Sequence, residues 1–432
     1  MSKSFYIFIC LVAAMGGLLF GYDWVVIGGA KPFYEMYFNI ADSPVMQGVA
    51  MTTALIGCLI GAMVAGALSD KYGRKPLLVC AAVLFTVSAV MTGAVNDFTL
   101  FNIARFIGGI GIGVASALSP VYIAEVSPAN IRGRMVSLNQ MTIVLGILAA
   151  QIVNMLIGTG VEESWGCNVG WRWMFWAETL PAALFLVLAF FIPESPVYLQ
   201  LKKNALHVSD SDGKKEGLKE LFTKKYSAVL LLGIIVAVFQ QWSGTNVIFN
   251  YAQEIFVSAG FDVDGMFINI VITGIANVVF TFVALYTIEK WGRRTLILIG
   301  AGGLGVIYGL IGLCYALQVS GMVMVALVVA AISVYAMTLG PVTWTLLAEI
   351  FPHRVRGIAM ATCTFALWVG CCTLTFSFPT MNAVLGSYGT FWTYAIICAL
   401  AFVFLFRRCP ETKGKSLEEI EQLFGLDSKK NV

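Results

Sequence analysis

The sequence contains few charged residues: Asp, Glu, Lys and Arg together make up 12% of its 432 residues, whereas hydrophobic residues make up 59%. Soluble domains carry about a quarter charged residues, and a soluble protein of this length could not cover its surface with so few. The composition therefore excludes a soluble globular protein and indicates a membrane protein. The net charge of +3 is too small to indicate a nucleic-acid partner.

Several kinds of chemical site are also absent from the sequence. The two histidines and ten cysteines show no zinc-binding spacing and no Cys-x-x-Cys pair, so we expect the cysteines to be small buried hydrophobic residues. No segment resembles a Walker phosphate loop, which argues against ATP as the energy source. We also see no cleavable signal peptide and no N-glycosylation sequon, as expected of a bacterial protein.

Apolar runs long enough to cross a bilayer recur along the chain. We predict an all-α membrane protein with twelve spanning helices, the first at 6–30 and the last two at 356–380 and 388–408. With a cytoplasmic N-terminus, 24 of the 27 lysines and arginines lie on the cytoplasmic side, as the positive-inside rule requires. Lys31 and Arg172 are then external, and Arg105 falls inside a span.

Three short motifs occur twice, in the same order. Asp-Lys-Tyr-Gly-Arg-Lys is echoed 219 positions later, Glu-x-x-Pro-x-x-x-Arg-Gly 224 positions later, and Pro-Glu-Ser 217 positions later as Pro-Glu-Thr. The first copies begin at Asp70, Glu125 and Pro193, and the second copies at Glu289, Glu349 and Pro410. We therefore predict two related six-helix bundles at 1–192 and 229–408, a cytoplasmic linker at 193–228 and a cytoplasmic tail at 409–432.

Two parallel repeats suit a transporter whose halves rock around a central site. Carboxylates and arginines at the cytoplasmic helix ends can form bidentate pairs, which would hold that side closed and separate when it opens. The alternative is that these residues only anchor the topology. The predicted gating network consists of Asp70, Arg74, Glu125, Arg132, Glu194, Glu289, Arg293, Glu349 and Arg356.

Seven motifs in order carry a resemblance to a known family. They are Gly-Tyr-Asp at 21–23, Asp-Lys-Tyr-Gly-Arg at 70–74, Arg-Phe-Ile-Gly-Gly-Ile-Gly at 105–111, Pro-Glu-Ser-Pro at 193–196, Gln-Gln-x-x-Gly-x-Asn at 240–246, Gly-Pro-Val-x-Trp at 340–344 and Pro-Glu-Thr-Lys-Gly at 410–414. Over essentially its whole length the chain resembles the sugar porter family of the major facilitator superfamily, and within it bacterial xylose and hexose–proton symporters. The resemblance implies two six-helix bundles around a central cavity.

Polar side chains at the centres of apolar spans require an explanation. Amides donate and accept hydrogen bonds, as sugar hydroxyls do, whereas an anionic substrate would call for Arg or Lys. Tryptophan rings can lie against the C–H face of a sugar; the alternative is that these residues only pack helix against helix. From these properties and the family motifs, the expected substrate contacts are Gln140, Gln240, Gln241, Asn246, Asn277, Tyr335, Trp344 and Trp368.

The sequence departs from the xylose–proton symporters near this expected pocket. Ile147 and Leu367 stand where those proteins have glutamines, and Asn250 stands where they have a tyrosine. Val197 replaces the arginine that is usual after Pro-Glu-Ser-Pro. The sugar therefore stays open between a pentose and a hexose.

A charged pair inside the membrane suggests proton coupling. Asp23 lies in the second half of the first span, and Arg105 needs a partner because an isolated buried charge is costly. If the two separate during transport, the proton affinity of the carboxyl group changes. Facilitative members of the family typically have Asn in place of Asp23, so the aspartate favours symport; a static ion pair in a uniporter is the alternative.

We therefore expect a monomeric, multi-pass protein of the bacterial inner membrane that imports a monosaccharide with a proton by alternating access. We predict no enzymatic activity, catalytic residue, metal site or cofactor; the partners are the sugar, the proton and the lipid bilayer. The alternatives are a facilitative uniporter and a non-transporting sugar sensor. Sensors tend to carry long cytoplasmic extensions, and only about two dozen residues follow the last predicted span. A drug–proton antiporter would leave the sugar motifs unexplained.

Overall fold

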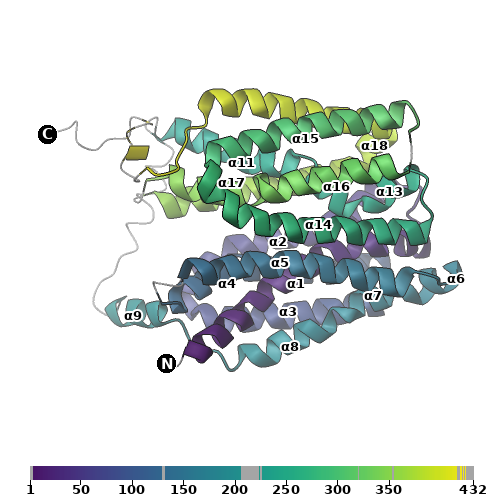
Figure 1. Cartoon of the computed structure of the whole chain (residues 1–432). Coiled ribbons are helices and arrows are strands. Elements are labelled where there is room, and N and C mark those ends of the chain that lie inside the picture. Colours follow the sequence, from purple (N-terminus) through teal and green to yellow (C-terminus); the bar gives the residue numbers. More distant parts are fainter. Residues whose placement is uncertain are drawn as a thin grey trace. The chain divides into compact units, whose positions relative to one another are not determined.

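The structure is a computed structural model that describes residues 3–128, 132–205, 223, 226–319, 321–352, 355–415, 419, 420, 422 and 424 (Figure 1). Up to residue 205 the helices are α1 (Lys3–Tyr37), α2 (Pro44–Tyr72), α3 (Arg74–Ala94), α4 (Phe98–Val126), α5 (Arg132–Gly158), α6 (Glu163–Trp165), the π-helix η1 (Gly166–Gly170), α7 (Trp171–Ala177), α8 (Thr179–Ala189) and α9 (Pro196–Ala205). The later helices are α11 (Ser227–Trp242), α12 (Thr245–Asn250), α13 (Ala252–Ser258), α14 (Val263–Trp291), α15 (Arg293–Ala316), α16 (Met322–Met337), α17 (Leu339–Ile350) and α18 (Arg356–Arg408). Much of the predicted linker and tail lies outside the described residues.

Eleven helical stretches within the described residues have the length and composition to cross a membrane. The last of them, Ile358–Arg408, is 51 residues long and belongs to α18. Gly386 breaks α18 with φ 68° and ψ 171°, a conformation that glycine adopts without steric cost. The predicted spans at 356–380 and 388–408 therefore correspond to the two parts of α18.

Three of the other predicted spans are each divided into shorter helices. Glu178 separates α7 from α8, and Thr338 separates α16 from α17. Each break lies three residues before a proline, Pro181 or Pro341, which has no N–H to bond to the carbonyl four residues earlier. The third break follows α11 at Gly244, where φ is 87°. These breaks place polar residues within otherwise apolar helices.

The first helix is longer than the predicted span, which ends at residue 30. It continues through Lys31 and Pro32 to Tyr37. The predicted span ends at residue 30, and Lys31 was expected on the external side of the membrane. In the structure Lys31 is 1% exposed and ion-paired, so its charge does not interrupt the buried helix.

Small residues let α2 and α4 pack with their backbones close together. A Cβ atom on Gly57 would lie 2.3 Å from the carbonyl oxygen of Phe106, and one on Gly113 would lie 2.2 Å from that of Cys58. Glycine at these positions is therefore a packing requirement of the kind found in membrane helix pairs.

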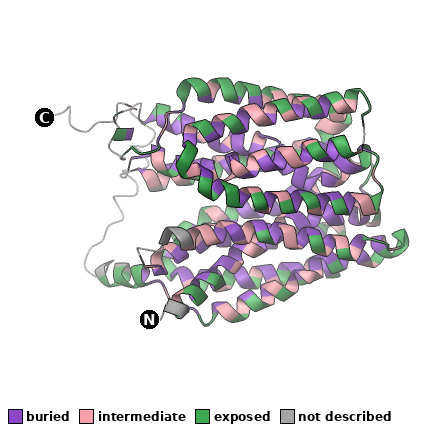
Figure 2. Cartoon of the chain, in the orientation of Figure 1, coloured by how far each residue is buried: buried purple, intermediate pink, exposed green. Residues whose placement is uncertain are grey.

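Large apolar side chains are exposed on several of the helices (Figure 2). Leu156, Leu180, Val306 and Ile396 are examples, each more than half exposed. In water such exposure would be costly, but it suits helices whose outer faces contact hydrocarbon, because all their backbone groups are bonded within the helix.

The chain packs as two compact units. Unit 1 consists of Met1–Val208, Phe249–Val278 and Thr375–Ala383, and unit 2 of Ser209–Ile248, Val279–Leu374 and Val384–Val432. Within unit 1, for example, the Gly160 amide donates to Asp264 Oδ1 at 3.1 Å. The units thus group some residues differently from the two predicted bundles, which rest on the sequence repeats and stay a prediction.

Candidate functional site

Asp23 on α1 and Arg105 on α4 form an ion pair inside unit 1. Their side chains are 2% and 3% exposed. Nη1 of Arg105 donates to Asp23 Oδ1, Nη2 donates to the Asp23 carbonyl oxygen at 3.3 Å, and the guanidinium lies 5.4 Å from the centre of the Phe175 ring. The structure therefore brings together the two residues that the sequence analysis paired.

Glu178 is a third buried charged residue beside this pair, and the sequence analysis did not single it out. It lies at the break between α7 and α8, is 2% exposed, and its carboxyl group interacts with Asp23 and Arg105. No hydrogen bond of normal geometry reaches Asp23 Oδ2 within the described residues. Two carboxyl groups thus face one guanidinium away from water, so a single proton on either carboxyl makes the cluster neutral.

Four of the predicted sugar-binding residues form one chain of hydrogen bonds inside unit 2. Gln240 Nε2 donates to the Tyr335 hydroxyl at 2.8 Å, and Gln241 Nε2 donates to Gln240 Oε1 at 2.6 Å. Asn246 Nδ2 donates to Gln241 Oε1 and lies 3.9 Å from Cys371 Sγ. Gly244 allows this arrangement, because its positive φ turns the chain between α11 and α12.

The other four predicted binding residues lie on α5, α14, α17 and α18. Trp368 on α18 is buried in unit 2, whereas Trp344 on α17 is 38% exposed. Gln140 on α5 is half-buried, and Asn277 on α14 is buried; both belong to unit 1. That Gln140 and Asn277 meet the amides of unit 2 around one sugar remains a prediction.

Three of the four residues that depart from the xylose–proton symporters are buried, whereas Val197 is 38% exposed. Ile147, Leu367 and Asn250 are 8%, 3% and 4% exposed. Leu367 and Cys371 lie one turn apart on α18, and Cys371 contacts Asn246. The Cys371 thiol therefore borders the amides on this helix, and the apolar Leu367 lies one turn away from it.

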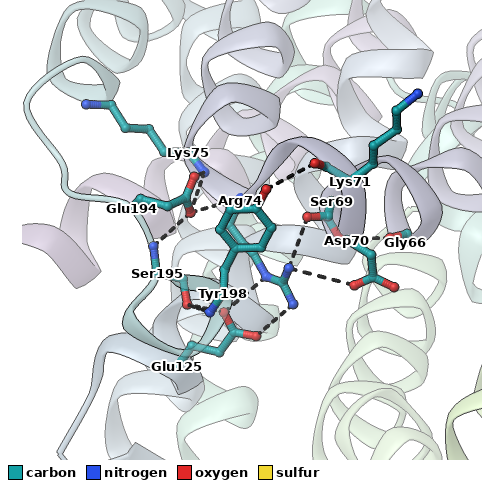
Figure 3. Close-up of polar contacts among 10 residues, drawn as sticks. All are labelled: Gly66, Ser69, Asp70, Lys71, Arg74, Lys75, Glu125, Glu194, Ser195 and Tyr198. Atoms are coloured by element: carbon teal, nitrogen blue, oxygen red, sulfur yellow. Dashed lines mark hydrogen bonds and ion pairs between the residues drawn. The ribbon is translucent and has the colours of Figure 1, made fainter. Parts of the chain in front are cut away.

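Figure 3 shows four residues from the first half of the predicted gating network, all in unit 1: Asp70, Arg74, Glu125 and Glu194. Arg74 binds Glu125 through two hydrogen bonds, from Nε and from Nη2, each of 3.1 Å. Its Nη1 donates to the Ser69 carbonyl at 3.0 Å and lies 3.7 Å from Asp70. The Ser195 hydroxyl also donates to Glu125. The arginine thus joins α3 to the ends of α2 and α4.

The second half of the network, in unit 2, repeats these contacts. Arg293 contacts Glu349 through Nε at 3.2 Å and Nη2 at 3.0 Å, and Nη2 lies 2.9 Å from Glu289. The Thr412 hydroxyl donates to Glu349, as Ser195 does to its counterpart. The paired sequence motifs therefore form paired structures.

Three residues of the predicted network need separate description. Glu194 accepts from the backbone amides of Arg74 and Lys75 at 2.9 and 3.2 Å, so it caps the first turn of α3 rather than binding a guanidinium. Arg356 donates from Nε and Nη2 to the Phe351 carbonyl at 3.1 Å. The side chain of Arg132 lies outside the described residues.

No group of three His, Cys, Asp or Glu side chains in the described part of the chain could hold a metal ion. The buried residues that sequence reasoning missed are instead Glu178 and Lys31. A charged residue in an apolar stretch was the available signal for both. Lys31 was expected on the external side of the membrane, and Glu178 lies inside the predicted span at 172–192.

Comparison with known proteins identifies the family. The family described as "Sugar (and other) transporter" matches residues 9–212 and 206–424. The chain is 36% identical to the arabinose-proton symporter of Bacillus subtilis (strain 168), covering 98% of this chain and 96% of that protein. It is also 36% identical to the D-xylose-proton symporter of Escherichia coli (strain K12), covering 99% and 98%.

A solved structure with the same fold is the inward open conformation of the xylose transporter XylE from E. coli. It superposes with a TM-score of 0.85 at 35% sequence identity, covering 97% of this chain and 99% of that one. The expected fold, an all-α membrane protein of the major facilitator type, is thereby confirmed. The chain is a multi-pass membrane protein that belongs to the sugar porter family of the major facilitator superfamily.

Proposed function

We propose that this chain is a secondary active transporter that imports a monosaccharide, a pentose or a hexose, together with a proton by alternating access. The observation that carries the proposal is the buried carboxyl group of Asp23 against Arg105. Relatives named as arabinose-proton and D-xylose-proton symporters support it over the full length of the chain.

Proton coupling follows from the charges of three buried residues, Asp23, Arg105 and Glu178. While Arg105 contacts Asp23, its guanidinium balances the charge of one carboxylate. If Arg105 moves away, the unbalanced carboxylate of Asp23 must take up a proton or remain charged out of water, which is costly. A change in this one contact therefore binds or releases a proton.

Sugar binding follows from the amides of unit 2. Gln240, Gln241 and Asn246 carry donors and acceptors that match sugar hydroxyls, and Tyr335 adds a hydroxyl group to the same chain. In the proposed site Gln140 and Asn277 contribute further amides, and Trp344 and Trp368 contribute rings for the C–H face of the sugar. The departures from the xylose–proton symporters at Ile147, Leu367 and Asn250 leave the choice between a pentose and a hexose open.

The Arg74 and Arg293 networks support the proposed gating role. Each joins helix ends through a bidentate arginine–carboxylate pair, Arg74 with Glu125 and Arg293 with Glu289, and such a pair can break as a unit when the cytoplasmic side opens. In this proposal the protein acts as a monomer in the bacterial inner membrane with both termini in the cytoplasm, and it makes no covalent bond.

Uptake in proteoliposomes tests the function. Purified protein is reconstituted, and radiolabelled xylose, glucose, galactose and arabinose are offered with and without an inward proton gradient. We expect at least one sugar to accumulate above its external concentration only with the gradient, and its entry to acidify the lumen. Equilibration without accumulation or acidification would instead identify a uniporter.

Asp23→Asn tests the coupling residue directly. The variant keeps the size of the side chain but cannot bind or release a proton, so accumulation should be lost while exchange of labelled for unlabelled sugar continues. Asp42→Asn is the matched control, because it makes the same change at an exposed position. Accumulation by Asp23→Asn under an imposed gradient would refute the assignment.

A further inference from the structure

Lys31 is a buried cation that the proposed transport mechanism does not use. It lies on α1 and is 1% exposed, although a lysine out of water must be paired to stay charged. With the cytoplasmic N-terminus predicted from the sequence, it lies toward the external end of α1. The residues that contact Lys31 therefore lie near the external side of the protein.

Two carboxylates share this ammonium group. Lys31 Nζ lies 3.1 Å from Glu35 Oε1, one turn further along α1, and donates to Glu254 Oε1 on α13. The ammonium also lies 5.2 Å from the centre of the Tyr251 ring. We call Lys31, Glu35 and Glu254 the Lys31 cluster; all three belong to unit 1.

The two ion pairs of the Lys31 cluster differ in what they connect. The pair with Glu35 lies within α1 and cannot influence the position of any other helix. The pair with Glu254 joins α1 to α13, which is only seven residues long and follows the turn at Tyr251. It is therefore the member of the cluster that can hold α13 in place.

The backbone next to the cluster is packed for close approach. A Cβ atom on Gly28 of α1 would lie 2.9 Å from the carbonyl oxygen of Phe249 and 3.0 Å from that of Asn250. The turn between α12 and α13 thus rests directly on α1, one helical turn before Lys31. Asn250, at this turn, follows the amide-bearing segment of the proposed sugar site.

The charges of the Lys31 cluster allow the contact between α1 and α13 to form and break reversibly. One ammonium cannot balance two ionised carboxylates, and Glu254 Oε2 is buried without a hydrogen bond among the described residues. Separation of the helices would hydrate the three charged groups, whereas an apolar contact of the same size would lose stability on exposure to water. The cluster therefore suits a contact that must form and break repeatedly.

From these observations we propose that Lys31 is a positioning residue for the transport cycle. Its ion pair with Glu254 holds α13 against α1 while the external side is closed, and the pair separates when that side opens. This inference rests on the proposed function for its biological meaning. The contact itself can be tested without any sugar.

A matched pair of variants separates the two ion pairs. Glu254→Gln leaves Lys31 paired with Glu35, and Glu35→Gln leaves it paired with Glu254. Each variant removes one carboxylate and leaves one ammonium facing one carboxylate. They differ in whether the remaining pair joins α13 to α1.

Hydrogen–deuterium exchange of the full-length protein in lipid nanodiscs, without sugar, is the measurement. We expect the amides of 252–258 to exchange at least about tenfold faster in Glu254→Gln, equivalent to about 1.4 kcal/mol, and at close to the wild-type rate in Glu35→Gln. Unchanged exchange in α4 shows that the fold is intact. Equal acceleration in both variants, or none in Glu254→Gln, would overturn the proposal.

A charge exchange provides the rescue. The double variant Lys31→Glu with Glu254→Lys keeps one cation and two carboxylates and still joins α1 to α13, so it should restore slow exchange in 252–258. If either variant also changes exchange in α4, this double variant decides: restored protection supports the proposal, and continued fast exchange refutes it.

Transport adds a readout that a purely structural role would leave unchanged. By favouring the externally open state, Glu254→Gln should lower the KM for external sugar and also lower the maximum rate of net uptake. If the wild-type protein moves no sugar, the proposed function is refuted. The hydrogen–deuterium exchange of α13 is measured without sugar, so it tests the ion pair between Lys31 and Glu254 in either case.

Discussion

Burial changes the chemistry of individual side chains, and Cys409 is an example outside the spans. It follows the last helix and is 4% exposed. Burial raises the pKa of its thiol to about 12, the carboxylate of Glu411 acts in the same direction, and the Arg294 guanidinium opposes them. Since the thiolate is the reactive form, Cys409 should be inert at neutral pH.

We expect N-ethylmaleimide at pH 8 to leave Cys409 unmodified in the folded protein and to label it after denaturation in SDS, as followed by peptide mass spectrometry. The shift also affects stability. The unfolded thiol loses its proton near its ordinary pKa of 9.0, whereas the folded one keeps it to about 12, so the free energy of unfolding falls across this interval as pH rises. Equal labelling rates in the folded and denatured protein would contradict the assignment.

Sequence reasoning found some buried charges and missed others for a physical reason. Asp23 and Arg105 stood out because each lies well inside an apolar run. Lys31 lies next to a proline, and a charge beside a proline normally marks a helix end. Its burial depends on Glu254, more than two hundred residues away, and such a contact is visible only in three dimensions.

At the scale of elements, the glycine turn between α2 and α3 has the same structure as the turn between α14 and α15. Gly73 joins α2 to α3 with φ 102°, and Gly292 joins α14 to α15 with φ 86°. A Cβ atom would lie 2.2 Å from Glu194 Oε2 at the first turn and 2.6 Å from Glu411 Oε2 at the second. Each glycine thus provides both a left-handed backbone and room for the carboxylate that caps the next helix.

Gly73→Ala should therefore destabilise the protein by at least about 1–2 kcal/mol, the cost of a left-handed backbone for a residue with a Cβ atom. Gly66→Ala is the matched control, because Gly66 lies in α2 with nothing within 4 Å of a Cβ atom. There alanine should be neutral or stabilise the helix by up to about 1 kcal/mol. Thermal unfolding of both variants tests the prediction, which fails if their midpoints shift equally.

The breaks within helices were only partly predictable. Pro181, Pro341 and Gly244 are visible in the sequence, yet each lies in an apolar run long enough to be read as a continuous span. Hydropathy detects the span and not its interruptions, because the residues at a break contribute little to the mean. Local backbone geometry decides where Glu178 and the amides point.

For the whole molecule, the duplication has an energetic consequence. The Arg74 and Arg293 networks have the same design but share no residue, and each lies within its own unit. Free energies of substitutions without shared partners generally add. The two networks should therefore contribute to stability independently.

Arg74→Lys and Arg293→Lys each keep the charge but lose the bidentate geometry, at a cost of about 1–2 kcal/mol. The double variant should lose the sum of the two costs to within about 0.5 kcal/mol in the free energy of unfolding, measured by denaturant titration. A coupling energy above about 1 kcal/mol would show that the networks depend on each other.

The family and its fold were accessible from sequence, since motif order, apolar run length and lysine and arginine placement all depend on local residues. The pairing of Gln240 with Tyr335 depends on where α11 and α16 pack, and no sequence spacing encodes that distance. The sequence also does not identify the sugar, because discrimination at a single hydroxyl group depends on still finer placement of side chains.

The chain of amides in unit 2 has a calorimetric consequence. Without a ligand, Gln240, Gln241 and Asn246 already bond to one another and to Tyr335. In the proposed site, an arriving sugar replaces those bonds with its own, so we expect the heat released on binding to be the small difference between two sets of similar bonds. Titration calorimetry with a transported sugar should therefore show a small binding enthalpy.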